Sequence, residues 1–345
     1  MRRTLLPMLL LGVVGCQGAP VPGSAVEANA GSPEIHKTAQ ALFKPLPEPQ
    51  AASADMVELG RMLYYDPRLS MSGKISCNSC HNLKSYGVDG KATSSGDKGQ
   101  LGGRNSPTVY NASLHLAQFW DGRSPDVEDQ AMGPVLNSVE MAMPDDKHVA
   151  TVLSAIPYYK ARFQKLFPDQ KTPVTLRNAA AAIGAFERGL STPSKFDDYL
   201  KGDLEALSPA EEKGLETFVG VGCASCHSGV AVGGSSYQKM GLKVPYPDAD
   251  VGRFGVTGKE RDREVFKVPS LRNITETGPY LHRGQVTELA ETVQLMGHHQ
   301  LGKELSPAEI DEIRTFLGAL KGQIPEDYIA PPTLPPDEAG FSPEV

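Results

Sequence analysis

Residues 77–81 read Cys-Asn-Ser-Cys-His, and residues 223–227 read Cys-Ala-Ser-Cys-His. The pattern is typical of a covalently attached c-type haem, in which two thiols add to the porphyrin vinyl groups and the histidine is the proximal ligand of iron. A zinc ribbon or a pair of disulfides would not require a histidine after each cysteine pair. We therefore expect two haem c groups, one attached by Cys77, Cys80 and His81, and one by Cys223, Cys226 and His227.

The N-terminus reads as a lipoprotein signal peptide over residues 1–15. Its apolar run is too short to span a bilayer and ends in Val13-Val14-Gly15-Cys16. This ending resembles a lipobox, which implies acylation of Cys16; an ordinary signal peptide with an incidental cysteine is the alternative. We expect a lipid-anchored protein on the periplasmic side of the bacterial envelope. The outer membrane is preferred, because Gln17 replaces the aspartate that retains some lipoproteins at the inner membrane.

Composition excludes some classes of partner. The net charge of -7 comes without a basic run, which argues against nucleic acid and anionic lipid surfaces. The chain has 345 residues, 40% of them hydrophobic, and can bury one or two cores. Haem attachment and lipidation account for all 5 cysteines, so we expect no disulfide.

Helical patterns dominate the middle of the chain, and strand signals are sparse. Helices are predicted from the apolar stripe at 56–63, the alanine-rich stretch 174–190, and Ser-Pro-Ala-Glu starts at 208 and 306. Residues 16–54 are rich in Ala, Pro and Gly and predict a flexible tether. Residues 323–345 predict a Pro-rich tail, with packing as an extended strap as the alternative.

Each haem motif is followed by the same spacing of proline, asparagine and glycine. The first set is Pro107, Asn111 and Gly122, and the second is Pro269, Asn273 and Gly284. This match predicts a mainly α fold of two cytochrome c-like domains related by internal duplication, each with one haem. We expect the N-terminal domain over residues 55–205 and the C-terminal domain over 206–322.

The two halves differ twelve residues after the glycine, where the first has Pro134 and the second Met296. Proline has no atom that binds iron, whereas a thioether does. We therefore expect an open face at the N-terminal haem and His227/Met296 ligation at the C-terminal haem. His298 or His299 is the competing ligand, and a core methionine is the alternative role for Met296.

A carboxyl group lies close to the expected open face. Glu140 follows Pro134 by six residues, and Gln130 precedes it by four. A carboxylate over open iron can take a proton from bound hydrogen peroxide and return it to the leaving oxygen. A solvated surface acid is the alternative.

These motifs resemble the bacterial di-haem cytochrome c peroxidases and their relative, the tryptophan tryptophylquinone-maturing enzyme. The resemblance covers about residues 55–322 and rests on residues 104–108, 119–123, 128–134, 140–141 and 267–273. It implies a peroxidatic haem at the first motif and a high-potential electron-transfer haem at the second. It also implies reduction of hydrogen peroxide with electrons from a small cytochrome c or a cupredoxin.

The resemblance assigns roles to further residues. Met296 matches the axial methionine of the peroxidases, where the quinone-maturing enzyme carries tyrosine. Glu140 and Gln130 match a distal acid and amide, and Trp120 matches an electron relay between the haems, with core packing as its alternative. The remaining matches imply an inter-domain calcium site, whose oxygen ligands come from Asn105 and the carbonyls of Thr277 and Pro279. A water in place of the ion is the alternative.

One departure from the family lies in residues 93–97, which read Thr-Ser-Ser-Gly-Asp. Many family members have a histidine, which caps the peroxidatic haem, where this chain has Asp97. With glycines around it, the loop is expected to be flexible and the resting enzyme open without reductive activation. His115 is the alternative capping ligand.

Two other functions stay open: oxidation of Trp or Tyr residues on a partner protein, and electron transfer alone. A homodimer is an open alternative to a monomer.

Overall fold

The computed structural model describes residue 1, residues 32–49 and residues 52–336. Most of the signal peptide and Cys16 therefore lie outside the described residues. The fold is mainly helical, as predicted, and the described residues form one small antiparallel sheet of β1 (Tyr237–Lys239) and β2 (Val265–Lys267). No helix in the described part is long and apolar enough to cross a membrane.

The helices begin where local signals predict them. Ser208 and Ser306 each accept a hydrogen bond from the backbone N–H three residues on, and a proline follows each serine at the first helical position. The stretches 56–63 and 174–190 lie largely in α2 and α7. The helices are α1 (Pro33–Leu42), α2 (Ala54–Tyr65), α3 (Cys77–Cys80), α4 (Val127–Leu136), α5 (Asp146–Ala155), α6 (Pro157–Leu166), α7 (Leu176–Glu187), α8 (Lys195–Lys201), α9 (Pro209–Val221), α10 (Phe254–Thr257), α11 (Leu289–Met296) and α12 (Pro307–Ala319).

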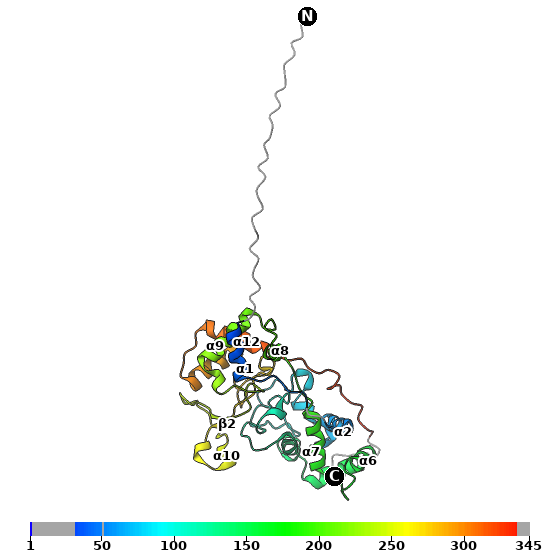
Figure 1. The fold of residues 1–345 in the computed structure, drawn as a ribbon. Coiled ribbons are helices and arrows are strands. Elements are labelled where there is room, and N and C mark those ends of the chain that lie inside the picture. Colours follow the sequence, from blue (N-terminus) through cyan, green and yellow to red (C-terminus); the bar gives the residue numbers. More distant parts are fainter. Residues whose placement is uncertain (2–31, 50–51, 337–345) are drawn as a thin grey trace. The chain divides into compact units, whose positions relative to one another are not determined.

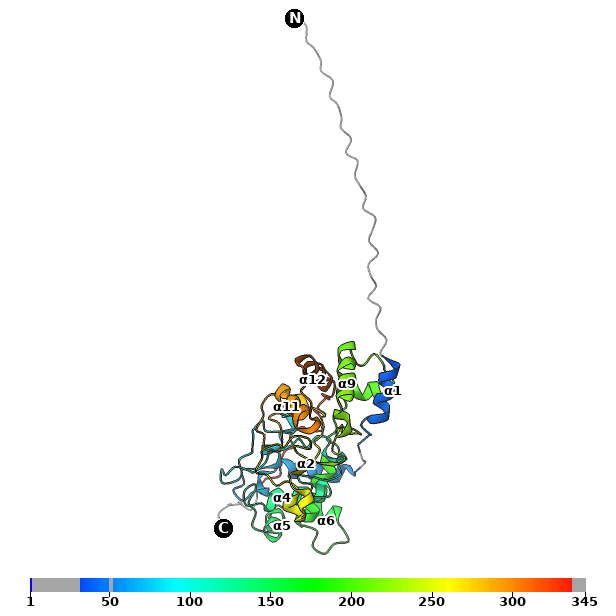
Figure 2. The same ribbon diagram turned by 90° about the vertical axis from the view of Figure 1, so that its left-hand side faces the viewer.

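Two hydrophobic cores organise the described chain. The first is built on α2 and α7 with α4, α5 and α6, and the second on α9 and α12 with α1, α8 and α11. Figures 1 and 2 show α2 with α6 and, apart from them, α9 with α12 and α1. Glycine allows the central pair of each core to approach closely. A Cβ on Gly60 would lie 1.8 Å from the Ala182 carbonyl oxygen, and one on Gly214 would lie 2.1 Å from that of Glu312.

The predicted tether is shorter in the structure, because residues 33–43 pack on the second core. Ala39 and Phe43 are fully buried there, and the backbone N–H of Leu46 donates to Asp197 at 2.7 Å. Helix α8 also joins this core. The apolar residues of segment 33–43 pack against residues about 160 positions further along the chain. Local composition does not reveal a contact of this kind.

The tail packs as a strap on the first core as far as it is described. Ile329 is fully buried, and the ring of Tyr328 stacks on Phe186 with centroids 5.2 Å apart. The Tyr65 hydroxyl donates to the Ile329 carbonyl at 2.6 Å. Each half is thus completed by the opposite end of the chain.

The segments after the two haem motifs share backbone features at positions 162 residues apart. Asn111 and Asn273 have φ of 59° and 61°, and Gly122 and Gly284 have φ of 65° and 61°. Isolated β-bridges join residues 118 and 124 in the first half and residues 280 and 286 in the second. The two asparagines meet at Thr192, whose hydroxyl accepts from the Nδ2 atoms of Asn111 at 2.8 Å and Asn273 at 2.9 Å.

Candidate active site

A cavity that is open to solvent lies against the second haem motif. Its walls include Cys223, Cys226 and His227 together with Met296, the last residue of α11. Burial lowers the pKa of His227 to about 4, which keeps the imidazole neutral, the form that binds iron. These features fit a haem c.

The residues that compete with Met296 are engaged elsewhere. The Nδ1 atom of His299 lies 3.0 Å from the Val244 carbonyl oxygen, and His298 pairs with Glu304. Neither histidine lines the cavity, whereas Met296 does. The arrangement favours Met296 as the ligand opposite His227, and this assignment stays a prediction.

The first motif forms the short helix α3 and the residue after it. Burial raises the pKa of the Cys77 thiol to about 12 and also raises that of Cys80. His81 holds its Nδ1 atom 3.0 Å from the carbonyl oxygen of Pro107, which leaves Nε2 for a metal. Burial lowers the pKa of His227, and the backbone of Pro269, the counterpart of Pro107, partly offsets this by raising it, although His227 Nδ1 forms no hydrogen bond within the described residues.

The ligand set of each motif suits haem iron better than a bare ion. Within the described ranges, no group of three or more His, Cys, Asp or Glu side chains gathers to hold a metal. The four described cysteines are free of disulfides. Each motif thus offers one histidine and two thiols, which fits a porphyrin that supplies the other ligands.

Glu140 lies near enough to the first motif for its charge to raise the pKa of the Cys80 thiol, in addition to the larger effect of burial. Burial raises the pKa of Glu140 itself, while Asn137 and Arg123 lower it in part. Asn137 donates from Nδ2 to Glu140 Oε1 at 2.8 Å. The other carboxylate oxygen, Oε2, therefore stays available to a substrate. The sequence did not predict that the Asn137 amide orients this carboxylate.

Gln130 lies on α4, whose C-terminal end connects to the Glu140 turn. The N–H of Met141 donates to the Pro134 carbonyl at 3.1 Å, which folds this turn back onto the helix. Gln130 is partly buried, and its side chain forms no hydrogen bond with Glu140. The structure places both predicted distal residues on one continuous segment without joining them.

The loop around Asp97 is anchored, contrary to the expected flexibility. Both the N–H and the hydroxyl of Ser72 donate to Asp97 Oδ1, at 3.0 Å and 2.5 Å. The N–H of Asp97 donates to the Glu140 carbonyl at 2.7 Å. A Cβ on Gly96 would lie 1.7 Å from the Val139 carbonyl oxygen, so glycine serves close packing here. Asp97 is thus part of the support for the Glu140 turn.

His115 lies in the wall of the cavity at the second motif. Its Nδ1 atom is 2.9 Å from the Nζ atom of Lys267. This placement opposes the alternative that His115 caps the N-terminal haem.

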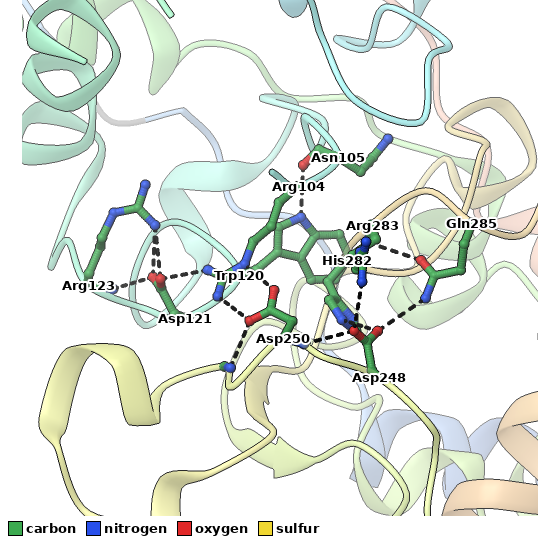
Figure 3. A network of polar contacts seen from close by, with 11 residues as sticks. Arg104, Asn105, Trp120, Asp121, Arg123, Asp248, Asp250, His282, Arg283 and Gln285 are labelled. Atoms are coloured by element: carbon green, nitrogen blue, oxygen red, sulfur yellow. Dashed lines mark hydrogen bonds and ion pairs between the residues drawn. The ribbon is translucent and has the colours of Figure 1, made fainter. Parts of the chain in front are cut away.

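Trp120 lies where the two halves meet and lines the same cavity. Its Nε1 donates to the Asn105 carbonyl at 3.0 Å, and His282 of the second half approaches its ring edge-on with centroids 6.2 Å apart. Figure 3 shows the surrounding polar network, in which Arg104 bridges Asp121 and Asp250. This position fits the predicted relay between the two motifs.

The three predicted calcium ligands, Asn105, Thr277 and Pro279, all line this cavity. The Nδ2 atom of Asn105 donates to the Lys91 carbonyl at 2.9 Å, which directs the amide nitrogen away and leaves Oδ1 for a cation. The three residues therefore share one cavity, and calcium binding stays a prediction.

Comparisons with known proteins agree with this site. Residues 54–205 match the family described as Di-haem cytochrome c peroxidase. The chain is 47% identical to the Cytochrome c551 peroxidase of Nitrosomonas europaea over 90% of its length and 92% of that protein's. It is 46% identical to the Cytochrome c551 peroxidase of Pseudomonas aeruginosa, covering 87% and 90%.

A solved structure described as a MauG-like protein associated with microbial copper homeostasis is similar in fold, with a TM-score of 0.72 and 28% identity. The match covers 84% of this chain and 96% of that one. With the haem motifs, the cavity and these identities in agreement, the chain belongs to the di-haem cytochrome c peroxidase family.

Proposed function

We infer that this protein is a cytochrome c peroxidase, which reduces hydrogen peroxide to water with electrons from a small redox protein. A small cytochrome c or a cupredoxin is the proposed donor. The observation that carries the inference is the half-buried Glu140 carboxyl, oriented by Asn137 and near the first haem motif. The identities of 47% and 46% to named peroxidases support it. Haem iron, when bound, supplies peroxide binding and the redox change.

The side chains of the protein transfer the protons and orient the peroxide. Glu140 accepts a proton from the peroxide oxygen nearer to iron and returns it to the leaving oxygen, which departs as water. Partial burial suits this exchange because it raises the pKa of the carboxyl above its ordinary value, which makes the group a better proton acceptor. Gln130 orients the peroxide, and Trp120 carries electrons between the halves. His227 and Met296 close the electron-transfer centre.

Further details belong to the same proposal. The shared backbone features after the motifs support descent of the two halves from one duplicated haem domain. Asn105, Thr277 and Pro279 would hold calcium between them. Asp97 is engaged by Ser72 and His115 by Lys267, which supports a resting enzyme open to peroxide. Lipidation of Cys16 would tether the enzyme to the outer membrane on its periplasmic side, as a monomer or a homodimer.

A second function would be oxidation of Trp or Tyr residues on a partner protein, as in the quinone-maturing relative. Methionine at position 296 and the higher identity to peroxidases disfavour it. Electron transfer alone would need neither an open iron nor Glu140. Catalytic oxidation of a reduced cytochrome c by peroxide separates the proposed function from both.

The test uses Glu140→Gln, with the exposed Glu216→Gln as a matched control. General acid–base catalysis typically contributes about 10²–10⁴-fold. We expect the rate of reaction with peroxide, measured by stopped flow, to fall by that factor at unchanged haem content. An unchanged rate would refute the role of Glu140.

EPR of the fully oxidised protein tests whether the resting enzyme is open to peroxide. One high-spin and one low-spin haem are expected, and two low-spin haems that are inert to peroxide would contradict an open resting enzyme.

A further inference from the structure

Lys267 and His115 form a buried polar pair in the wall of the second cavity. Lys267 ends strand β2, and its Nζ atom lies 2.9 Å from Nδ1 of His115, a residue of the first half. Lys267 is buried and His115 is partly buried, and neither has a role in the chemistry proposed above.

The backbone brings these two residues together from opposite halves. The N–H of Lys267 donates to the Trp120 carbonyl at 2.8 Å, and that of Leu116 donates to the Gly234 carbonyl at 2.8 Å. Gly234 has φ of +74°, and a Cβ there would lie 2.5 Å from His115 Cδ2. Glycine at 234 thus makes the space that the imidazole occupies.

The hydrogen-bonding roles in the pair follow from chemistry. A lysine ammonium has only donors, so Nδ1 of His115 accepts, and the proton of the neutral imidazole is on Nε2. That Nε2 is buried and has no hydrogen-bond partner in the part of the chain that the structure describes. Burial lowers the pKa of His115 well below its ordinary value, and the Lys267 charge lowers it further, which keeps the ring neutral.

Lys267 also lacks a counter-charge. Within residues 32–49 and 52–336, no carboxylate forms an ion pair with it, although a buried cation is ordinarily paired. Burial lowers the pKa of Lys267 to about 8, which measures the cost of this position. Both residues line the cavity; the Lys267 cation has no counter-charge, and the buried Nε2–H of His115 has no acceptor, in the part of the chain that the structure describes.

We propose that Lys267 and His115 form a carboxylate-binding site, and that its ligand is a propionate of the haem attached to Cys223 and Cys226. The proposal rests on the proposed function only in requiring this second haem. A propionate would accept from the ammonium and from Nε2–H, which satisfies both donors and neutralises the buried charge. A free carboxylate or inorganic anion has the same chemistry, and the experiment distinguishes the two sources.

The test measures the midpoint potential of the low-spin haem in Lys267→Met. The loss of a cation beside a propionate stabilises ferric iron, so the potential should fall. We expect the ratio of reduced to oxidised haem at a fixed applied potential to decrease at least about tenfold, which is 59 mV for a one-electron couple. Lys243→Met, which removes an exposed lysine, should leave the potential unchanged.

A second readout depends on the ligand directly. The propionate bending mode in the resonance Raman spectrum should shift in Lys267→Met and also in His115→Phe, which keeps the lysine. Unchanged potential and bending modes in variants with two haems per chain would overturn the site while leaving the peroxidase intact.

Two further outcomes separate the remaining possibilities. Fewer than two haems in the unmodified protein, by pyridine haemochrome assay, would refute this proposal and the proposed function together. A potential that shifts with added acetate or phosphate at constant ionic strength, in the parent but not in Lys267→Met, would identify a free anion and overturn the propionate assignment.

Discussion

Arg272 and Asp197 form an ion pair that is almost completely removed from solvent, with side chains 0% and 1% exposed. Two hydrogen bonds of 2.9 Å and 2.8 Å join them. The same carboxylate accepts from the N–H groups of Leu46 and Ser194. It therefore ties the N-terminal segment and the start of α8 to the loop after the second haem motif. Arg272→Met leaves this carboxylate buried without its cation.

Breaking a buried pair by removing one partner typically costs about 3–5 kcal/mol. The bonds from Leu46 and Ser194 remain and still solvate Asp197, so we expect a loss near the lower end, about 3 kcal/mol at neutral pH. Burial raises the pKa of Asp197, but the hydrogen bonds and charge of Arg272 lower it below its ordinary value overall. That depressed pKa stabilises the fold above the ordinary aspartate pKa, and the stabilisation is lost as the pH falls through the folded-state pKa. The cost of Arg272→Met should therefore shrink in acid.

The free energy of unfolding is measured by urea denaturation of the holoprotein, followed by far-UV circular dichroism and haem absorbance at about pH 7 and about pH 4. Arg314→Met is the control, because it breaks an exposed ion pair with Asp311 on α12. Such pairs contribute about 0–1 kcal/mol. A loss below about 1 kcal/mol for Arg272→Met at neutral pH would refute the reasoning.

Three other predictions concern single positions. Burial, aided by the charge of Glu128, raises the pKa of Glu187 to about 8. Its contribution to stability is therefore complete below the ordinary carboxyl pKa and is lost as the pH rises toward 8. Glu187→Gln should flatten this decline in urea midpoints, and an unchanged slope would contradict it. Gly96→Ala should push the Glu140 turn away and slow the peroxide reaction at least about tenfold, whereas Gly103→Ala, with nothing within 4 Å, should not. Met296→His should lower the potential of the low-spin haem; an unchanged absorption spectrum would show that Met296 is not the ligand.

Local signals predicted the parts of the fold that are decided locally. The serine starts of α9 and α12 act over one helical turn, and the Cys-x-x-Cys-His spacing is imposed by one porphyrin. The loops at Asn111 and Asn273, which the equal spacing paired, have the same left-handed backbone conformation, while the duplication itself stays a prediction.

The remaining features depend on partners far apart in the chain. Asp97 is held by Ser72, 25 residues away, and Lys267 meets His115 across 152 residues. Helix α1 has too few apolar residues to be separated from a linker until the second core is known. No periodic pattern marks such contacts, which arise only when the two halves pack together.

The meeting of Asn111 and Asn273 at one hydroxyl has a consequence for electron tunnelling. The Thr192 hydroxyl accepts from both amides, and a Cβ on Gly322 would lie 2.0 Å from the Thr192 carbonyl oxygen. This joint of Asn111, Thr192 and Asn273 is therefore tightly packed. Tunnelling rates decay exponentially with the separation of two redox centres. Each asparagine lies four residues after the proline beside its haem histidine, so this joint ties together the two segments that flank the motifs. A single threonine thus acts as a spacer whose rigidity limits how far the rate between the two centres can vary.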